Sequence, residues 1–331
     1  MNRLEKNYFY NGNKPHNNLI SSLDCLEKVL YHALSEHIPD CKYAFCNDIN
    51  LNICQCHKLY NYYPNRLDLN TDLFKIESYC PEPEKSLTLL EQLIDSGTLV
   101  AINTMFDILP PYTWYMQEDK RGKSNTHFCT IIGYDENNYF FVDDPSMLVD
   151  ERLIRYNNNP TIGLIKKNTL KTAFNEYCQI ITVKVNKGCL PYINKFDVIK
   201  SQVIDNYNSK SCFYDDTIVI LGRNALEKLT TDVYDDAILS TIVSNFYWVH
   251  LMYSRRILFK ECIKDISDNN TNINLILMNL DKSISEWKAV YRIIATHVYK
   301  RQYSNLPYIL SKRIEKIINI EDSLIESLNK L

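Results

Sequence analysis

The change in hydrophobic periodicity near residue 190 constrains the fold of this chain more than any other feature. After about residue 195, apolar residues recur every three or four positions over long stretches, which predicts amphipathic helices. The predicted long helices cover 237–266, 273–302 and 304–331. The polar stretch "DISDNNTN" between the first two predicts a loop with capping residues. We therefore expect a helical subdomain over 191–331.

The chain before that point has mixed signals. Helical patterns cover 23–36 and 84–96, and short runs rich in β-branched and aromatic residues predict strands at 98–104, 127–135, 137–144 and 178–186. The residues "DENN" join the second and third of these runs and form a good hairpin turn. The fold class that follows is α+β, with one domain over 1–190 ahead of the helical subdomain.

Composition and glycine content exclude several classes of function. The 331 residues carry a formal net charge of -3, which does not suggest a nucleic-acid partner. Neither a P-loop nor a dinucleotide-binding glycine pattern occurs, so nucleotide chemistry is not expected. The chain shows neither a signal peptide nor a run of about 18 apolar residues, which predicts a cytoplasmic protein with no membrane partner. Eleven scattered cysteines then predict reduced thiols.

Cys25 lies in the first turn of the predicted helix over 23–36. Unpaired backbone N–H groups and the positive end of the helix dipole favour a thiolate at that position, although the adjacent Asp24 opposes this effect. Ser21 or Ser22 would cap the helix. Cys25 is a candidate nucleophile, and the alternative interpretation is a buried helix cysteine.

A cysteine nucleophile needs a base, and the base needs an orienting partner. His127 opens the strand "HFCTIIGYD", and the following strand, "NNYFFVDDP", returns toward it with Asp143 and Asp144. Because neighbouring side chains of a strand point to opposite faces, only one of the two aspartates can meet the imidazole. The hairpin therefore supplies a histidine and a carboxylate, in the order Cys, His, Asp.

These residues, together with "GTLVAI" and "LPPY", resemble the papain-like superfamily in its bacterial branches. "DILPPYTWY", "GRNALEKL" and "YSRRILFKE" look more narrowly like the butirosin-biosynthesis acyltransferase family of the BtrH type, or like papain-like closthioamide-type synthetases of polythioamide assembly. The resemblance implies a papain-like (C39-like) cysteine-peptidase fold with a helical C-terminal subdomain. It also implies that Cys25 is the nucleophile, His127 the base and Asp144, which precedes Pro145, the orienting acid.

The implied reaction is amide-bond formation in natural-product (antibiotic) biosynthesis. The cysteine would accept an acyl group from a carrier-protein thioester and pass it to a small amine or diamine. The protein itself would need no cofactor and no metal, because the phosphopantetheine belongs to the acyl or peptidyl carrier protein. A cysteine peptidase, amidase or thioesterase on the same triad, and a catalytically silent carrier-binding protein, are the alternatives.

Two features depart from the papain pattern. No glutamine precedes Cys25, so an amide of Asn17 or, as the candidate we prefer, Asn18 would donate into the oxyanion hole beside the backbone N–H of Cys25. The residue after the cysteine is Leu26 in place of the usual glycine.

Other residues are candidates for substrate binding. Tyr112, Trp114 and Tyr115 could line an acyl channel, or form no more than an aromatic turn, and Asp107, Asp235 or Asp236 could hold a cationic amine. Arg255 and Arg256 could form a solvated helix face or dock an acidic carrier protein. His250 and Trp287 are expected to pack between helices. Four further residues could hold zinc, but their C-x-C-H spacing is unlike that of ordinary structural zinc sites, so we prefer a loop with incidental thiols: Cys46, Cys54, Cys56 and His57.

Overall fold

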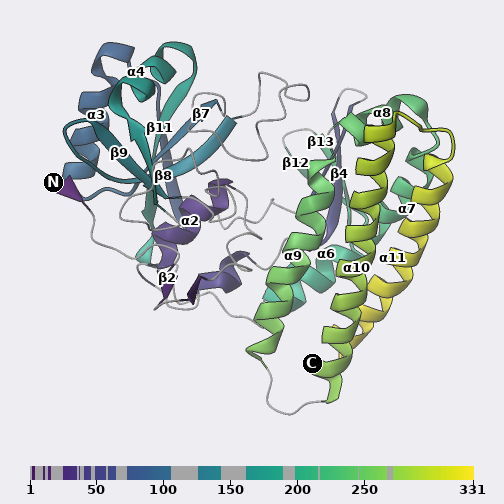
Figure 1. The fold of residues 1–331 in the computed structure, drawn as a ribbon. Helices are drawn as coiled ribbons and strands as arrows, with labels where there is room; N and C mark the ends of the chain where they lie inside the picture. The colour runs from purple at the N-terminus through teal and green to yellow at the C-terminus, as the bar shows by residue number, and fades with distance from the viewer. Residues whose placement is uncertain are drawn as a thin grey trace. The chain divides into compact units, whose positions relative to one another are not determined.

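The structure is a computed structural model in which the chain divides into two compact units (Figure 1). It describes residues 2–3, 10–11, 14–15, 25–35, 37, 41–45, 49–56, 59–64, 73–105, 126–142, 162–188, 198–214, 217–244, 246–266 and 271–331. Unit 1 comprises Met1–Cys41 and Asn70–Leu190, and unit 2 comprises Lys42–Leu69 and Pro191–Leu331. The two units are described separately below.

The segment 42–69 differs from the expected domain limits of 1–190 and 191–331, because it belongs to unit 2. It contributes β4 (Leu51–Cys56), which pairs with β13 (Thr217–Leu221), and β5 (Leu59–Pro64), which pairs with β4. Strand pairing across about 160 residues of sequence therefore assigns this segment to the second unit.

Unit 1 is built on a seven-stranded antiparallel sheet with the order β10-β9-β8-β7-β11-β6, in which β1 also pairs with β8. A separate two-stranded ribbon joins β2 to β3. The strands of the unit are β1 (Asn2–Arg3), β2 (Tyr10–Asn11), β3 (Lys14–Pro15), β6 (Phe74–Tyr79), β7 (Val100–Met105), β8 (Thr126–Tyr134), β9 (Asn138–Val142), β10 (Ile162–Lys166) and β11 (Cys178–Val185).

Two helices cover one face of this sheet. Side chains of α3 (Pro83–Asp95) and α4 (Lys167–Glu176) form a buried apolar cluster with every second residue of the central strands. Val100 and Ile102 of β7, and Cys129 and Ile131 of β8, belong to this cluster. We call this side the α3/α4 face. Because side chains alternate along a strand, the residues between them lie on the opposite face.

The helix α2 (Cys25–Ser35) packs on that opposite face, which we call the α2 face. Its buried His32 makes a hydrogen bond of 2.9 Å between Nδ1 and Oγ1 of Thr130, a β8 residue that alternates with Cys129 and Ile131. Figure 1 shows α2 beside β8. The helix predicted over 23–36 is thus confirmed, and its described part begins at Cys25.

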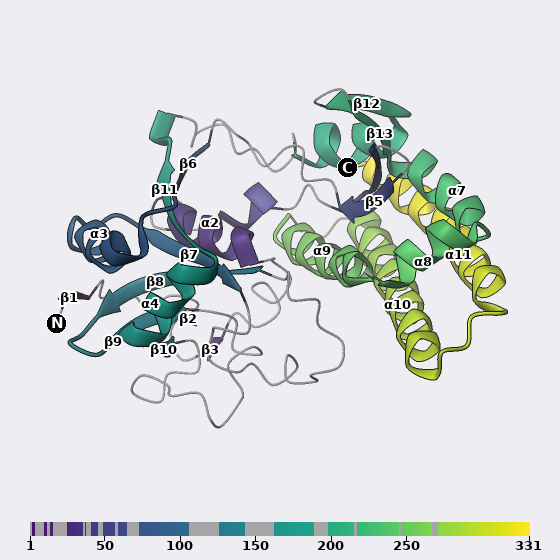
Figure 2. The ribbon, with the colours of Figure 1, turned by 90° about the horizontal axis from the view of Figure 1, so that it is seen from above.

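Unit 2 combines a four-stranded sheet, ordered β12-β13-β4-β5, with helices. Its other elements are β12 (Ser211–Tyr214), α6 (Asn206–Asn208), α7 (Gly222–Asp232), α8 (Asp236–Ser244), α9 (Tyr247–Lys264), α10 (Thr271–Lys300) and α11 (Leu306–Leu328). A π-helix (Val198–Asp205) and the 3-10 helix η1 (Cys41–Phe45) complete the described elements. Figure 2 shows α9, α10 and α11 side by side.

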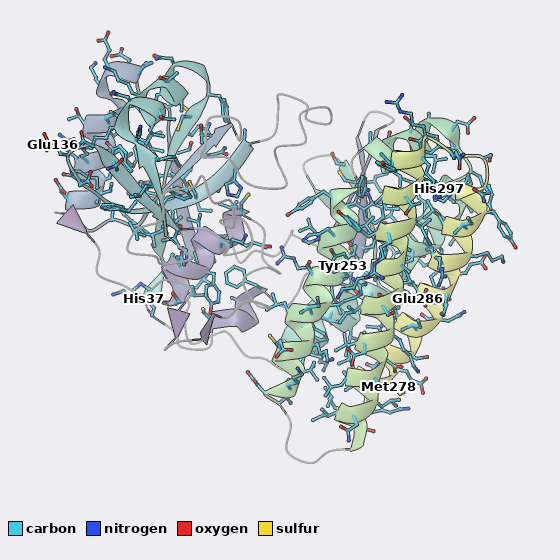
Figure 3. The ribbon with its side chains drawn as sticks, viewed as in Figure 1. His37, Glu136, Tyr253, Met278, Glu286 and His297 are labelled. Carbon is cyan, nitrogen blue, oxygen red and sulfur yellow. The ribbon has the colours of Figure 1, made fainter. Side chains whose placement is uncertain are left out.

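The predicted long helices are confirmed, except that 237–266 is divided into α8 and α9. The packing of α10 and α11 includes Glu286 of α10, whose carboxylate accepts hydrogen bonds from Arg313, at 2.8 Å, and from Lys316 of α11 (Figure 3). The chain is therefore of the α+β class, as expected. Within the described residues, no helix has both the length and the apolar character needed to cross a membrane.

The predictions for Arg255 and Arg256 were wrong, because both side chains are buried, at 1% and 0% exposure. Arg256 donates from Nε, at 2.7 Å, and from Nη2 to Oε1 of Glu321, and from Nη1 to the carbonyl of Met252 at 2.7 Å. The same Glu321 oxygen accepts hydrogen bonds from two groups of α10, Oγ of Ser283 at 2.8 Å and Nε1 of Trp287 at 3.2 Å. Arg256 therefore links α9, α10 and α11 from within the core and cannot dock a partner.

The expected packing roles of Trp287 and His250 are confirmed. Trp287 is fully buried, and its ring meets Trp248 at 6.0 Å between centroids. His250 packs among Tyr247, Tyr253 and Tyr291, and its Nδ1 lies 2.6 Å from the Tyr253 hydroxyl.

One cysteine departs from the expectation of reduced thiols. Cys262, which is buried in α9, is disulfide-bonded. The described cysteines that are not disulfide-bonded are Cys25, Cys41, Cys54, Cys80, Cys129, Cys178 and Cys212. This bond could not be predicted from the sequence, because the spacings of the cysteines show no paired framework.

Gly222 is a position where only glycine fits. Its φ is 47°, and a Cβ built there would lie 2.4 Å from the Cα of Tyr207. We expect Gly222→Ala to destabilise unit 2 by about 3 kcal/mol, because left-handed backbone strain and a clash with rigid backbone add. Gly97→Ala is the matched control: φ is 74° but no atom lies within 4 Å of the built Cβ, so only the strain, about 1 kcal/mol, should appear.

Thermal unfolding followed by circular dichroism measures both effects. Equal losses in the two variants would contradict the role given to the Tyr207 backbone.

Candidate active site

Cys25 occupies the first position of the described α2. Its thiol is free and its side chain is partly buried. The capping candidates Ser21 and Ser22, and the adjacent Asp24, lie outside the described residues. Cys25 is thus the first described residue of α2, and its place in the first turn of the helix stays a prediction from the sequence.

His127 is the second residue of β8 and is buried, at 3% exposure. It pairs with Thr104 of β7, and Thr104 in turn pairs with Cys178 of β11. Residues directly opposite each other in neighbouring strands share a face, so these three side chains form one row. Because Cys178 belongs to the buried cluster with α3 and α4, the row lies on the α3/α4 face.

Cys178 lies in the same cross-strand row as His127, so it is a second possible nucleophile. Burial raises the pKa of its thiol to about 12. A thiol with that pKa carries almost no thiolate at neutral pH, and the thiolate is the reactive form. Cys178 is therefore a packing residue, and Cys25 remains the better candidate.

The relation between Cys25 and His127 follows from the His32–Thr130 hydrogen bond. Cys25 lies seven residues before His32, which is about 10 Å along the helix and on the same helical face. His127 lies three residues before Thr130, which is about 10 Å along the strand and on the other face of the sheet. The structure thus brings the two elements together but gives His127 the face opposite to α2.

The β8–β9 hairpin forms as the sequence predicts. Asp135 accepts backbone hydrogen bonds from Asn137, at 2.8 Å, and Asn138, at 2.7 Å, which closes the turn. Thr130 pairs with Val142, which is the last described residue of β9 and directly precedes Asp143. Asp143 and Asp144 lie outside the described residues.

The remaining candidates for the site also lie outside the described residues. These are Asn17, Asn18, Asp107, Tyr112, Trp114 and Tyr115. Of the zinc candidates, Cys46 and His57 also lie outside them, and the part of the chain that is described contains no group of three or more His, Cys, Asp or Glu residues able to hold a metal ion. In unit 2, Asp235 has a structural role, since its Oδ1 accepts the N–H groups of Ala237 and Ile238 and caps α8.

A polar group on the α2 face was missed by the sequence reasoning. Asn103 of β7 pairs directly with Phe128, the neighbour of His127, and donates from Nδ2 to Oε1 of Gln179 at 3.2 Å and to the hydroxyl of Tyr177 at 3.4 Å. Asn103 is buried, at 6% exposure. The signal was present in "VAINTM", where an asparagine interrupts an apolar strand.

The described part of the site therefore contains a helix that begins at a cysteine, a strand that begins beside a histidine, and a buried amide group at the end of the same sheet. These features agree in order with a cysteine nucleophile followed by a histidine base. The chain matches no protein-family model, and no curated protein matches its sequence.

Proposed function

We propose that this chain is a papain-like cysteine acyltransferase that moves an acyl group from a carrier-protein thioester to a small amine. One observation carries the proposal: the helix that begins at Cys25 packs against β8, which holds His127, and β9 returns to the residue before Asp143 and Asp144. This order of elements is the one that the resemblance to papain-like enzymes implies. The proposal places the reaction in the cytoplasm, among carrier proteins of natural-product assembly.

The proposed chemistry has two steps. The Cys25 thiolate attacks the thioester carbonyl, the bond from carbon to the phosphopantetheine sulfur breaks, and the departing thiolate takes the proton from the His127 imidazolium. The amine then attacks the new acyl-enzyme thioester while His127 takes its proton. The bond to the Cys25 sulfur breaks, an amide forms, and the Cys25–His127 pair is restored. Amide formation from a thioester is favourable, so neither ATP nor a metal is required.

The proposal sets a geometric condition on His127. The equal offsets of about 10 Å from the His32–Thr130 contact bring Cys25 level with His127 if α2 runs in the same direction as β8. The imidazole projects from the α3/α4 face, whereas Cys25 belongs to the α2 face. The two groups can therefore meet only around the end of the sheet. His127 is the second residue of its strand, close to that end. An aspartate following Val142 would orient the imidazole from the adjacent strand.

A catalytically silent carrier-binding protein is the second candidate, and the opposite faces of His127 and α2 favour it. A peptidase, an amidase or a thioesterase would use the same residues, with water in place of the amine as the acceptor. These alternatives differ in whether an acyl-enzyme forms and in what resolves it.

Intact-mass measurement of the full-length chain tests the proposal. A short acyl-pantetheine thioester serves as the donor and putrescine as the acceptor. We expect a mass gain of one acyl group that Cys25→Ala abolishes, and its release as an amide when putrescine is added. Release by water alone, at a rate that putrescine leaves unchanged, would support the hydrolase. If the chain gains no mass from either this donor or acyl-loaded carrier protein, the proposal is overturned.

A further inference from the structure

The buried side-chain oxygen of Asn103, Oδ1, accepts no hydrogen bond from the described residues. Its Nδ2 already donates to Gln179 and Tyr177, whereas Oδ1 has no hydrogen-bond partner within the described part of the chain. A buried carbonyl left unsatisfied costs about 1–3 kcal/mol. An unsatisfied group of this kind therefore suggests a site for a ligand that donates a hydrogen bond.

The orientation of the Asn103 amide follows from its neighbour. The side-chain carbonyl oxygen of Gln179 can only accept a hydrogen bond, so the donor Nδ2 of Asn103 has to face it. Oδ1 of Asn103 then points away from Gln179. Gln179 is itself oriented by a contact of 3.5 Å from its Nε2 to Sγ of Cys80. The free group is therefore an acceptor.

Asn103 lies on the side of the sheet where Cys25 would act. Asn103 shares the α2 face with Thr130. It lies two residues along β7 from Ala101, the partner of Thr130, which is about 7 Å closer to the end of the sheet that holds His127. In the arrangement set out under the proposed function, Cys25 and Asn103 lie at the same end of the sheet and on the same face of it.

We propose that Oδ1 of Asn103 binds the amino group of the acceptor amine and presents it to the acyl-enzyme. This inference rests on the proposed acyl transfer. A primary amine can donate an N–H to the carbonyl oxygen and keep its lone pair free for attack. A neutral carboxamide suits this role better than a carboxylate, because a nearby negative charge would keep the amine protonated and unreactive. Given the proposed reaction, the ligand class that this acceptor fits is a primary amine.

The binding test separates this inference from the catalytic one. Putrescine is titrated calorimetrically into full-length Cys25→Ala, which cannot form an acyl-enzyme, and into the same chain carrying Asn103→Leu. We expect Asn103→Leu to weaken binding about tenfold, which corresponds to the loss of one hydrogen bond of about 1.4 kcal/mol.

Asn50→Leu is the matched control. Asn50 is equally buried and its Oδ1 also has no partner among the described residues, but it lies in unit 2, where its Nδ2 donates to the Val203 carbonyl at 2.9 Å. Putrescine binding should not change in this variant. If putrescine does not bind to Cys25→Ala, or binds equally well after Asn103→Leu, the inference is overturned, whatever the mass experiment shows.

Kinetics give a second readout on the Cys25-containing chain. Asn103→Leu should form the acyl-enzyme at the normal rate, while its KM for putrescine rises about tenfold. Asn103→Asp retains an acceptor but adds a charge, so amide formation should persist with its pH optimum shifted upward. Slower acylation in Asn103→Leu with an unchanged KM for putrescine would overturn the proposed role as well.

Discussion

Cys25→Ala should abolish amide formation from a carrier thioester, lowering its rate by about four orders of magnitude or more. The reason is that removal of a nucleophile ends covalent catalysis and leaves only binding and oxyanion stabilisation. The rate is measured by mass spectrometry of the amide product.

Cys212→Ala is the control for that variant. Cys212 is partly buried and outside any disulfide, like Cys25, but it lies on β12 of unit 2. Its replacement should leave the rate unchanged. If Cys25→Ala retains a substantial fraction of the activity, the nucleophile is another group and the proposed reaction has to be assigned elsewhere.

Glu321→Gln should destabilise unit 2 by about 3–5 kcal/mol. The substitution leaves the buried guanidinium of Arg256 without its counter-charge, and an uncompensated buried charge is strongly unfavourable. Burial already lowers the pKa of Arg256, and the Glu321 carboxylate opposes that effect. Urea unfolding followed by tryptophan fluorescence measures the loss, because Trp248 and Trp287 are both buried in this unit.

The double variant Arg256→Met with Glu321→Leu shows whether the charge itself is the cause. Apolar replacement of a whole buried ion pair is often neutral, so the double variant should recover much of the stability lost in Glu321→Gln. Glu315→Gln on the same helix breaks only the exposed pair with Lys312 and should not change the midpoint. If Glu321→Gln unfolds at the wild-type midpoint, the ion pair does not hold the helices together.

The sequence predicted the elements whose signals are local. The helical periodicity located α3, α10 and α11, and alternating apolar residues with a polar turn located the β8–β9 hairpin. These patterns reflect packing of one face of a helix or strand, which neighbouring residues encode. The α+β class follows from them directly.

The features that depend on distant partners could not be predicted. β4 pairs with β13 across a long stretch of sequence, so its place in unit 2 has no local signal. Arginines are mostly exposed, and the burial of Arg256 depends on Glu321, 65 residues further along the chain. Alternation along β8 gave His127 and Thr130 opposite faces, but only the His32 contact identifies the face that α2 covers.

The rate at which iodoacetamide alkylates Cys25 near pH 6.5 tests the pairing of Cys25 with His127 most directly. Peptide mass spectrometry compares this rate with that of Cys80, an exposed thiol of the same unit, in the wild-type chain and in His127→Ala. A thiol paired with an imidazole is ionised at this pH, whereas an ordinary thiol is almost fully protonated. We expect Cys25 to react faster than Cys80, and to slow about tenfold or more in His127→Ala. A Cys25 that reacts no faster than Cys80, and at a rate that His127→Ala does not change, would contradict the proposed pair.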